Sequence, residues 1–135
     1  MKKLLIVSLI AVAATSVLWA DEPTGSRKRM LAHKITVGDL SRTYYLHVPS
    51  NLPRDKAAAL VLMFHGGGGT PRFAARESKF NDLADREGFL VAYPEGIGKS
   101  WNDGRGVKSI PAQRKNIDDV AFVSALIDDV DRNHK

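Results

Sequence analysis

One stretch constrains the fold more than any other, an apolar run that leads directly into a histidine and four glycines. Residues 60–64 are Leu-Val-Leu-Met-Phe, and residues 65–69 are His-Gly-Gly-Gly-Gly. Five large apolar residues without polar alternation are typical of a strand that is covered on both faces of a mostly parallel sheet. Because glycine reaches positive φ and exposes its N–H group, the following residues predict a loop that presents donors to an anion.

This loop has two interpretations. Acyl transfer needs such donors, because its tetrahedral intermediate carries negative charge on an oxygen. A histidine followed by glycines after a core strand is the oxyanion-loop pattern of α/β-hydrolase lipases and esterases. The alternative is a tight glycine turn in which His65 is a hydrogen-bonded structural histidine, since short glycine motifs also match by chance.

Length and composition predict a globular domain or part of one. The chain has 135 residues, of which 44% are hydrophobic and 26% are charged, close to ordinary globular values. It contains no cysteine, so no disulfide framework stabilises it and the core must do so.

The first twenty residues predict a secretory signal peptide. Lys2 and Lys3 precede an apolar stretch over residues 4–12, and the small Ala20 stands before Asp21. The alternative, a retained membrane anchor, is disfavoured because the apolar core is short for a span. We therefore expect a secreted or periplasmic chain without a stable membrane anchor, with residues 21–33 as a linker.

The basic charge does not indicate a nucleic-acid partner. Cleavage after residue 20 removes two lysines and lowers the formal net charge from +5 to +3. The tight basic cluster Arg27-Lys28-Arg29 has no interleaved aromatic residues and is typical of a solvated linker. We expect no binding of nucleic acid.

The domain that follows the linker begins with a predicted hairpin. Ile35 and Val37 precede a Gly38-Asp39 turn, and residues 42–48 are rich in aromatic and β-branched side chains. His47 lies within the second strand, so we expect a strand histidine rather than a catalytic one.

An α/β layer architecture follows from the next segments. Phe73, Phe80, Leu83 and Ala84 have helical spacing and Gly88 suits a C-cap, so one helix is predicted before a buried strand at residues 89–93. Together with the central strand these elements indicate parallel core strands with flanking helices. Residues 94–117 form a long loop, a kind of segment that is often functional.

An amphipathic helix ends the sequence. Asn116 or Asp118 is a plausible cap. The predicted apolar stripe consists of Val120, Val123, Ile127 and Val130. The predicted solvated face carries Asp118, Asp119, Asp128, Asp129 and Asp131, which suit a polar face better than a metal site.

Six short motifs in this order resemble a known family. They are residues 42–49 (RTYYLHVP), the strand into residues 65–69, residues 80–89 (FNDLADREGF), Tyr93-Pro94, residues 101–104 (WNDG) and Asp118-Asp119-Val120. The series is similar to the secreted esterases of the polyhydroxybutyrate depolymerase, feruloyl esterase and acetylxylan esterase group, and it covers residues 34–135. The resemblance implies the α/β-hydrolase fold, a Ser/Asp/His triad, an ester substrate (polyester, or esterified polysaccharide or phenolic), and neither cofactor nor metal.

The chain departs from this family at the nucleophile. None of its nine serines stands in a G-x-S-x-G setting, and at the nearest, Ser100, Asn102 occupies the place of the second glycine. In the family the three triad residues follow a later strand, which would place them beyond Lys135. We therefore expect residues 34–135 to be a truncated, N-terminal half of an α/β-hydrolase domain that contains no catalytic triad residue.

The resemblance assigns roles to two loops. Gly67 is the first candidate for an oxyanion donor through its N–H group and Gly68 the second, with His65 and Gly66 completing the oxyanion loop; His65 anchors the loop rather than acting as a base. Trp101, Asn102 and Asp103 lie on the expected substrate-side loop, where they contact substrate or support the loop. The competing hypothesis is a secreted, non-catalytic binding module. In either case an uncovered sheet edge favours self-association.

Overall fold

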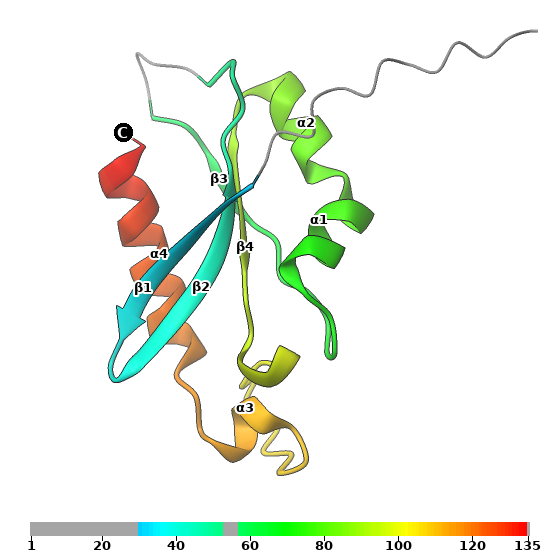
Figure 1. The fold of residues 1–135 in the computed structure, drawn as a ribbon, viewed down its shortest axis with the longest axis vertical. Coiled ribbons are helices and arrows are strands. Elements are labelled where there is room, and N and C mark those ends of the chain that lie inside the picture. The colour runs from blue at the N-terminus through cyan, green and yellow to red at the C-terminus, as the bar shows by residue number, and fades with distance from the viewer. Residues whose placement is uncertain (1–29, 53–56, 135) are drawn as a thin grey trace, which may run out of the picture.

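The computed structural model describes residues 30–52 and 57–134, which form a four-stranded sheet with helices on both faces (Figure 1). The strands are β1 (Leu31–Val37), β2 (Leu40–His47), β3 (Leu60–Leu62) and β4 (Leu90–Pro94). The helices are α1 (Pro71–Ser78), α2 (Phe80–Glu87), the 3-10 helix η1 (Ile97–Lys99), α3 (Pro111–Arg114) and α4 (Asp119–Asn133). The expected signal peptide and the cluster at residues 27–29 lie outside the described residues. β1 begins at Leu31, so strand structure starts inside the segment predicted as a linker.

The sheet is mixed rather than mostly parallel. Its order is β1-β2-β4-β3; β1 with β2 and β2 with β4 are antiparallel, and β3 with β4 is parallel. The predicted hairpin is confirmed, with a two-residue turn at Gly38 and Asp39. β2 leaves the hairpin beside β4 and runs in the opposite direction. β3 and β4 run in the same direction, because a helical crossover connects them.

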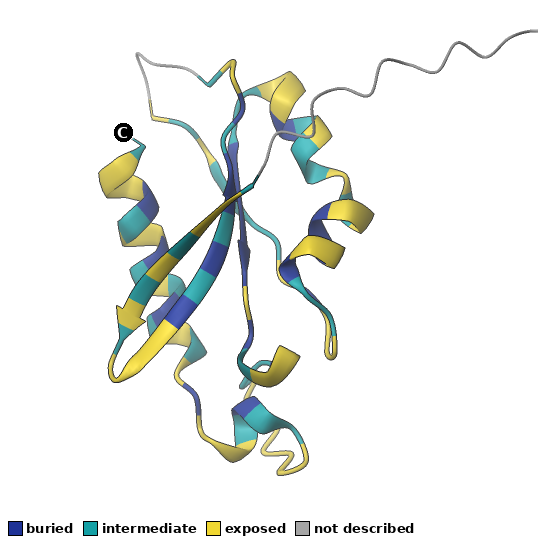
Figure 2. Ribbon diagram, viewed as in Figure 1, coloured by how far each residue is buried: buried dark blue, intermediate teal, exposed yellow. Residues whose placement is uncertain are grey.

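Helices cover both faces of the sheet (Figures 1 and 2). Residues of β4 alternate between two hydrophobic clusters, as strand geometry requires. Leu90 and Ala92 pack with Phe122 and Leu126 of α4. On the opposite face the second cluster contains Ala74, Ala75, Ala84, Val91 and Tyr93, which belong to α1, α2 and β4. The strand that is buried on both faces is therefore β4.

The central apolar run does not form the buried strand that its sequence predicts. β3 is three residues long and each of its side chains is half-buried, while Phe64 is 43% exposed. Among the described strands β3 pairs with β4 alone, so it lies at an edge. Within the described residues, the continuous apolar sequence therefore forms an edge strand, because an edge strand and a central strand can share this pattern.

The helix predicted between the glycines and β4 is two helices. Lys79 separates α1 from α2 and has a left-handed backbone with φ of 58°. Thr70 caps α1 by accepting a hydrogen bond from the Phe73 N–H at 3.2 Å. The predicted C-cap is confirmed, since Gly88 has φ of 75° and its N–H donates to the Ala84 carbonyl.

The last helix is confirmed, and its predicted apolar stripe was right at the buried Val130 but wrong at Val120 and Ile127. Asp118 is the cap and accepts a hydrogen bond from the Ala121 N–H at 2.8 Å. The residues buried against the sheet are Phe122, Leu126 and Val130. Val120 is 77% exposed and Ile127 is 44% exposed. The prediction followed the helical spacing of valine and isoleucine, whereas the larger Phe122 fills the core.

No helix within the described residues is long and apolar enough to cross a membrane.

The expectation for His47 is confirmed, because it is a buried strand histidine whose Nε2 lies 3.0 Å from Oδ1 of Asp85 on α2.

Candidate functional site

His65 ties the glycine loop to the segment that follows β4. The ring is 4% exposed, its Nδ1 lies 2.8 Å from the Gly66 carbonyl oxygen, and its Nε2 lies 3.1 Å from the backbone nitrogen of Gly96. A carbonyl can only accept and a backbone N–H can only donate, so Nδ1 carries the proton and Nε2 accepts. Both ring nitrogens are thus used by the backbone, which leaves no free lone pair for a general base.

Trp101 holds the same loop from the other side. Its Nε1–H donates to the His65 carbonyl at 2.9 Å, and the centres of the two rings lie 5.0 Å apart. Phe64 meets the indole edge to face at a centroid distance of 5.2 Å. The indole therefore packs on the junction between β3 and the glycine loop and supports it.

The glycine loop uses some of its N–H groups internally. Gly69 donates to the Gly66 carbonyl and Gly68 donates to the Lys99 carbonyl, each at 2.9 Å. Gly68 has φ of 77°, a conformation that favours glycine. The N–H groups of Gly66 and Gly67 have no hydrogen-bond partner among residues 30–52 and 57–134.

This pattern separates the two donor candidates that the sequence suggested. Gly68 N–H is already bonded to the protein, whereas Gly67 N–H is free to meet an anion. A β-carbon built on Gly67 would have no atom within 4 Å, so there is open space around this residue. The loop can therefore offer backbone donors to an oxyanion at Gly67 and at its neighbour Gly66.

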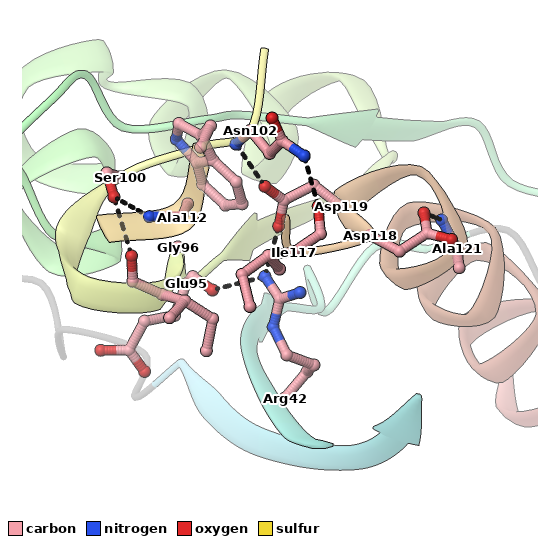
Figure 3. Close-up of polar contacts among 12 residues, drawn as sticks. Arg42, Glu95, Gly96, Ser100, Asn102, Ala112, Ile117, Asp118, Asp119 and Ala121 are labelled. Atoms are coloured by element: carbon pink, nitrogen blue, oxygen red, sulfur yellow. Dashed lines mark hydrogen bonds and ion pairs between the residues drawn. The ribbon is translucent and has the colours of Figure 1, made fainter. Parts of the chain in front are cut away.

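Asn102 fixes the expected substrate-side loop to α4 (Figure 3). Its backbone N–H donates to Oδ2 of Asp119 at 2.7 Å, and its side-chain amide donates to the Ile117 carbonyl at 2.9 Å. Asn102 and Trp101 thus support the loop through every polar contact that the structure gives them.

Asp103 lies apart from this arrangement and faces solvent. It makes an ion pair of 2.7 Å with Arg105 and accepts a hydrogen bond from the Gln113 amide at 2.9 Å. The hydrogen bond from Arg105 holds the pKa of the Asp103 carboxyl below its usual value.

A buried ion pair beneath this loop was missed by the sequence analysis. Arg42 of β2 is 1% exposed and its Nη2 lies 2.7 Å from Oδ1 of Asp119, whose side chain is 11% exposed (Figure 3). The guanidinium carbon also lies 3.9 Å above the ring centre of Phe122. The sequence did contain a signal for the burial of Arg42. It shares a strand face with Tyr44 and Leu46, which are both buried.

The prediction that the aspartates of α4 lie on a solvated face was wrong for Asp119 and Asp129, which both contact residues of β2. Oδ2 of Asp129 accepts a hydrogen bond of 2.7 Å from the Tyr44 hydroxyl. This bond lowers the pKa of Asp129, and burial raises the pKa of Tyr44. Asp128 is exposed, as expected.

Ser100 has the role of a structural bridge. Its hydroxyl donates to the Ile97 carbonyl at 2.9 Å and accepts from the Ala112 N–H at 3.2 Å (Figure 3). No histidine contacts it, so it lacks the base that activates a serine nucleophile. Within the described part of the chain no group of three His, Cys, Asp or Glu residues could hold a metal ion.

No family model matches the chain. Among curated proteins it is similar to "Putative esterase NocK" of Nocardia uniformis subsp. tsuyamanensis, with 31% identity over 101 residues that make up 73% of this chain and 28% of that protein. It is also similar to "Bifunctional acetylxylan esterase/xylanase XynS20E" of Neocallimastix patriciarum, with 32% identity over 94 residues, 69% of this chain and 12% of that protein.

The chain thus spans less than a third of the length of each of these relatives. Both relatives have esterase in their names, and the mixed sheet with helices on both faces is compatible with an α/β fold. The similarity supports an esterase family for this chain.

Proposed function

We propose that this chain supplies the oxyanion-binding part of a secreted, serine-dependent carboxylic-ester hydrolase. The observation that carries the proposal is the free N–H of Gly67, in a loop whose histidine is held through both ring nitrogens. Preorganised donors of this kind stabilise the charge that develops on the carbonyl oxygen during attack. They need no reorganisation, because His65 and Trp101 already fix the loop.

The nucleophile in this proposal comes from sequence that this chain does not contain. None of the nine serines has a serine-elbow setting, and the chain matches 28% of the NocK sequence. A serine would attack the ester carbonyl, a histidine would take its proton, and the N–H after the serine would join Gly67 in holding the oxyanion. The chain is, in this view, the N-terminal portion of the catalytic domain.

The edge of β3 offers a place for the missing strand. Parallel neighbours end at the same edge of a sheet, so a strand beside β3 would bring its serine turn next to the loop at residues 65–69. That strand is apolar in our proposal and ends in G-x-S-x-G. The half-buried side chains of β3 support this arrangement, because a neighbouring strand and the segments connected to it would cover them.

The substrate in this proposal is a polyester or an esterified polysaccharide or phenolic, and residues 1–20 direct export. The name of XynS20E favours an esterified polysaccharide among these. The basic and apolar pattern of the first twenty residues supports export.

A chimera tests the proposal directly. The 94-residue segment of this chain that aligns with the acetylxylan esterase XynS20E replaces its counterpart there, and acetate release from acetylxylan is measured. We expect turnover by the chimera, and Gly67→Pro, which removes the N–H, should lower kcat by about 100-fold to 1,000-fold. Gly67→Ala is the matched control, because it keeps the N–H and its β-carbon meets no atom within 4 Å.

Circular dichroism of each chimera separates loss of function from loss of fold. A folded chimera that releases no acetate would contradict the proposal and favour the non-catalytic binding module. Equal turnover by the Gly67→Pro and Gly67→Ala chimeras would remove Gly67 from the oxyanion site.

A further inference from the structure

One end of the molecule has an excess of positive charge next to the glycine loop. Residues 95–117 contain five Lys or Arg side chains and two carboxylates. Asp103 neutralises Arg105 at 2.7 Å. The other four cations are exposed and form no ion pair among the described residues; they are Lys99, Lys108, Arg114 and Lys115. We call these four residues the cationic surface.

Backbone contacts place these residues close to one another and to the oxyanion donors. The Lys99 carbonyl accepts the Gly68 N–H at 2.9 Å, and the Arg114 guanidinium donates to the Lys108 carbonyl at 3.4 Å. Ser100 joins η1 to α3 through the Ala112 N–H. Figure 1 shows η1 and α3 together at the end of the molecule where the glycine loop also lies.

The helical segments α1, α2 and α4 do not share this charge. Residues 71–88, which form α1 and α2, contain four cations and four carboxylates. Residues 118–134, which form α4 and its caps, contain five aspartates and one arginine. The positive charge is therefore concentrated at the end that carries the candidate site, where it would attract an anionic ligand.

We propose that the cationic surface binds the carboxylates of a polyuronate, an anionic polysaccharide that carries the ester to be cleaved. This inference rests on the proposed ester hydrolase function and specifies its substrate class. Four exposed cations on η1, on the loop before α3, on α3 and at its C-cap suit a repeating anion better than one small anion. An esterified polyuronate has carboxylates and esters on the same chain, so one ligand can meet both the cations and the glycine loop.

The cationic surface lacks the features of a single-stranded nucleic-acid site. Proteins that bind single-stranded nucleic acid combine cations with aromatic side chains on which bases stack. Residues 102–121 contain no aromatic residue, and the indole of Trp101 is packed against His65 and Phe64. The cationic surface therefore offers charge without a stacking platform.

Binding of the full chain to polymers tests the inference without requiring catalysis. Fluorescently labelled polygalacturonate, neutral arabinoxylan and single-stranded DNA are titrated with the chain at 20 mM to 300 mM salt. We expect binding to polygalacturonate that weakens as salt rises, and at least tenfold weaker binding to arabinoxylan. The triple variant Lys99→Gln, Lys108→Gln and Lys115→Gln should lower the affinity about tenfold. Each lost pair between an exposed lysine and a carboxylate should lower it roughly twofold, and the three factors multiply.

A second triple variant removes the same charge elsewhere. This control carries Lys34→Gln, Lys79→Gln and Arg86→Gln. Lys34 lies on β1, Lys79 between α1 and α2, and Arg86 on α2, so none of them belongs to the cationic surface and the affinity should change less than twofold. Lys79 also matches Lys99 in having positive φ. Circular dichroism checks that both variants are folded.

Three results would overturn the inference. They are equal affinity for arabinoxylan and polygalacturonate, an equal loss in both triple variants, and tighter binding of DNA than of polygalacturonate, which would instead indicate a nucleic-acid surface. Because the assay needs no nucleophile, its failure is distinct from failure of the acetate-release test of the chimera.

Discussion

Arg42 and Asp119 form a buried ion pair, 2.7 Å between Nη2 and Oδ1, that joins the second strand to the start of the last helix. The other carboxylate oxygen accepts the Asn102 N–H at 2.7 Å, so the same aspartate also holds the loop that carries Trp101. Trp101 in turn donates to the His65 carbonyl. A continuous set of polar contacts therefore runs from the sheet to the glycine loop.

Removing the carboxylate should destabilise the protein strongly. Asp119→Ala leaves the buried Arg42 charge without its partner, so we expect the free energy of unfolding to fall by about 3 to 5 kcal/mol. Urea unfolding followed by circular dichroism measures this change. Asp128→Ala is the matched control on the same helix, and because Asp128 is exposed we expect a change within about 0.5 kcal/mol. Equal effects of the two substitutions would contradict a stabilising role for the ion pair.

The elements that local signals specify were predicted well. The Gly38-Asp39 turn, the C-cap at Gly88 and the N-cap at Asp118 are as expected, because each depends on the chemistry of one or two residues. The last strand before the long loop was also found, at Leu90–Pro94.

The features that depend on tertiary contacts were not predicted. Whether an apolar run is an edge or a central strand depends on its neighbours, so β4 rather than β3 is the strand buried on both faces. Asp119 was assigned to a solvated face because its partner, Arg42, lies 77 residues away in sequence. In the candidate site, the glycines and His65 could be named from the sequence, which also ranked Gly67 before Gly68 as a donor. The contact that occupies the Gly68 N–H, with the Lys99 carbonyl, depends on tertiary structure and could not be predicted.

His65 should contribute to stability through both ring nitrogens. His65→Ala leaves the Gly96 N–H and the Gly66 carbonyl without this partner, and we expect a loss of about 2 to 4 kcal/mol from the two hydrogen bonds and the lost packing. His65→Gln keeps an acceptor at the end of the side chain, so it should lose less than His65→Ala. Thermal unfolding of the three proteins compares them; a stable His65→Ala protein would show that the loop does not need the ring.

Two neighbouring glycines should respond differently to alanine. Gly68 has φ of 77°, so Gly68→Ala should lower the free energy of unfolding by about 1 to 2 kcal/mol through backbone strain. Gly67 does not have positive φ and has open space around it. Gly67→Ala should therefore change the free energy of unfolding by less than about 0.5 kcal/mol. Urea unfolding of the two variants measures the difference. The reverse order would show that the loop has another conformation in solution.

Tyr93 should make the protein less stable at alkaline pH. Burial raises its pKa to about 12, while an unfolded tyrosine has a pKa of about 10. The folded state therefore keeps a proton that the unfolded state loses, and stability falls as pH rises from about 10 towards about 12, by roughly 2 to 3 kcal/mol from this group. We expect the loss between pH 9 and pH 11 to be smaller in Tyr93→Phe than in the wild type.

The matched control for this pH dependence is Tyr45→Phe, at a half-buried tyrosine of the adjacent strand. Urea unfolding at both pH values gives the free energies, and absorbance at 295 nm follows tyrosinate formation. A pH dependence that is unchanged by Tyr93→Phe would show that other groups cause it.

The 135-residue chain alone should not hydrolyse p-nitrophenyl acetate with saturable kinetics. Donors in the glycine loop stabilise charge after a nucleophile has attacked, and the Ser100 hydroxyl is bonded to the Ile97 carbonyl and the Ala112 N–H instead of to a histidine. Ser100→Ala should therefore leave the slow background rate unchanged while lowering the free energy of unfolding by about 1 kcal/mol, because the Ala112 N–H loses its acceptor. Release of p-nitrophenol over a range of ester concentrations measures the first effect and urea unfolding the second. Saturable turnover that disappears in Ser100→Ala would identify a nucleophile within this chain and overturn the assignment of that role to another segment.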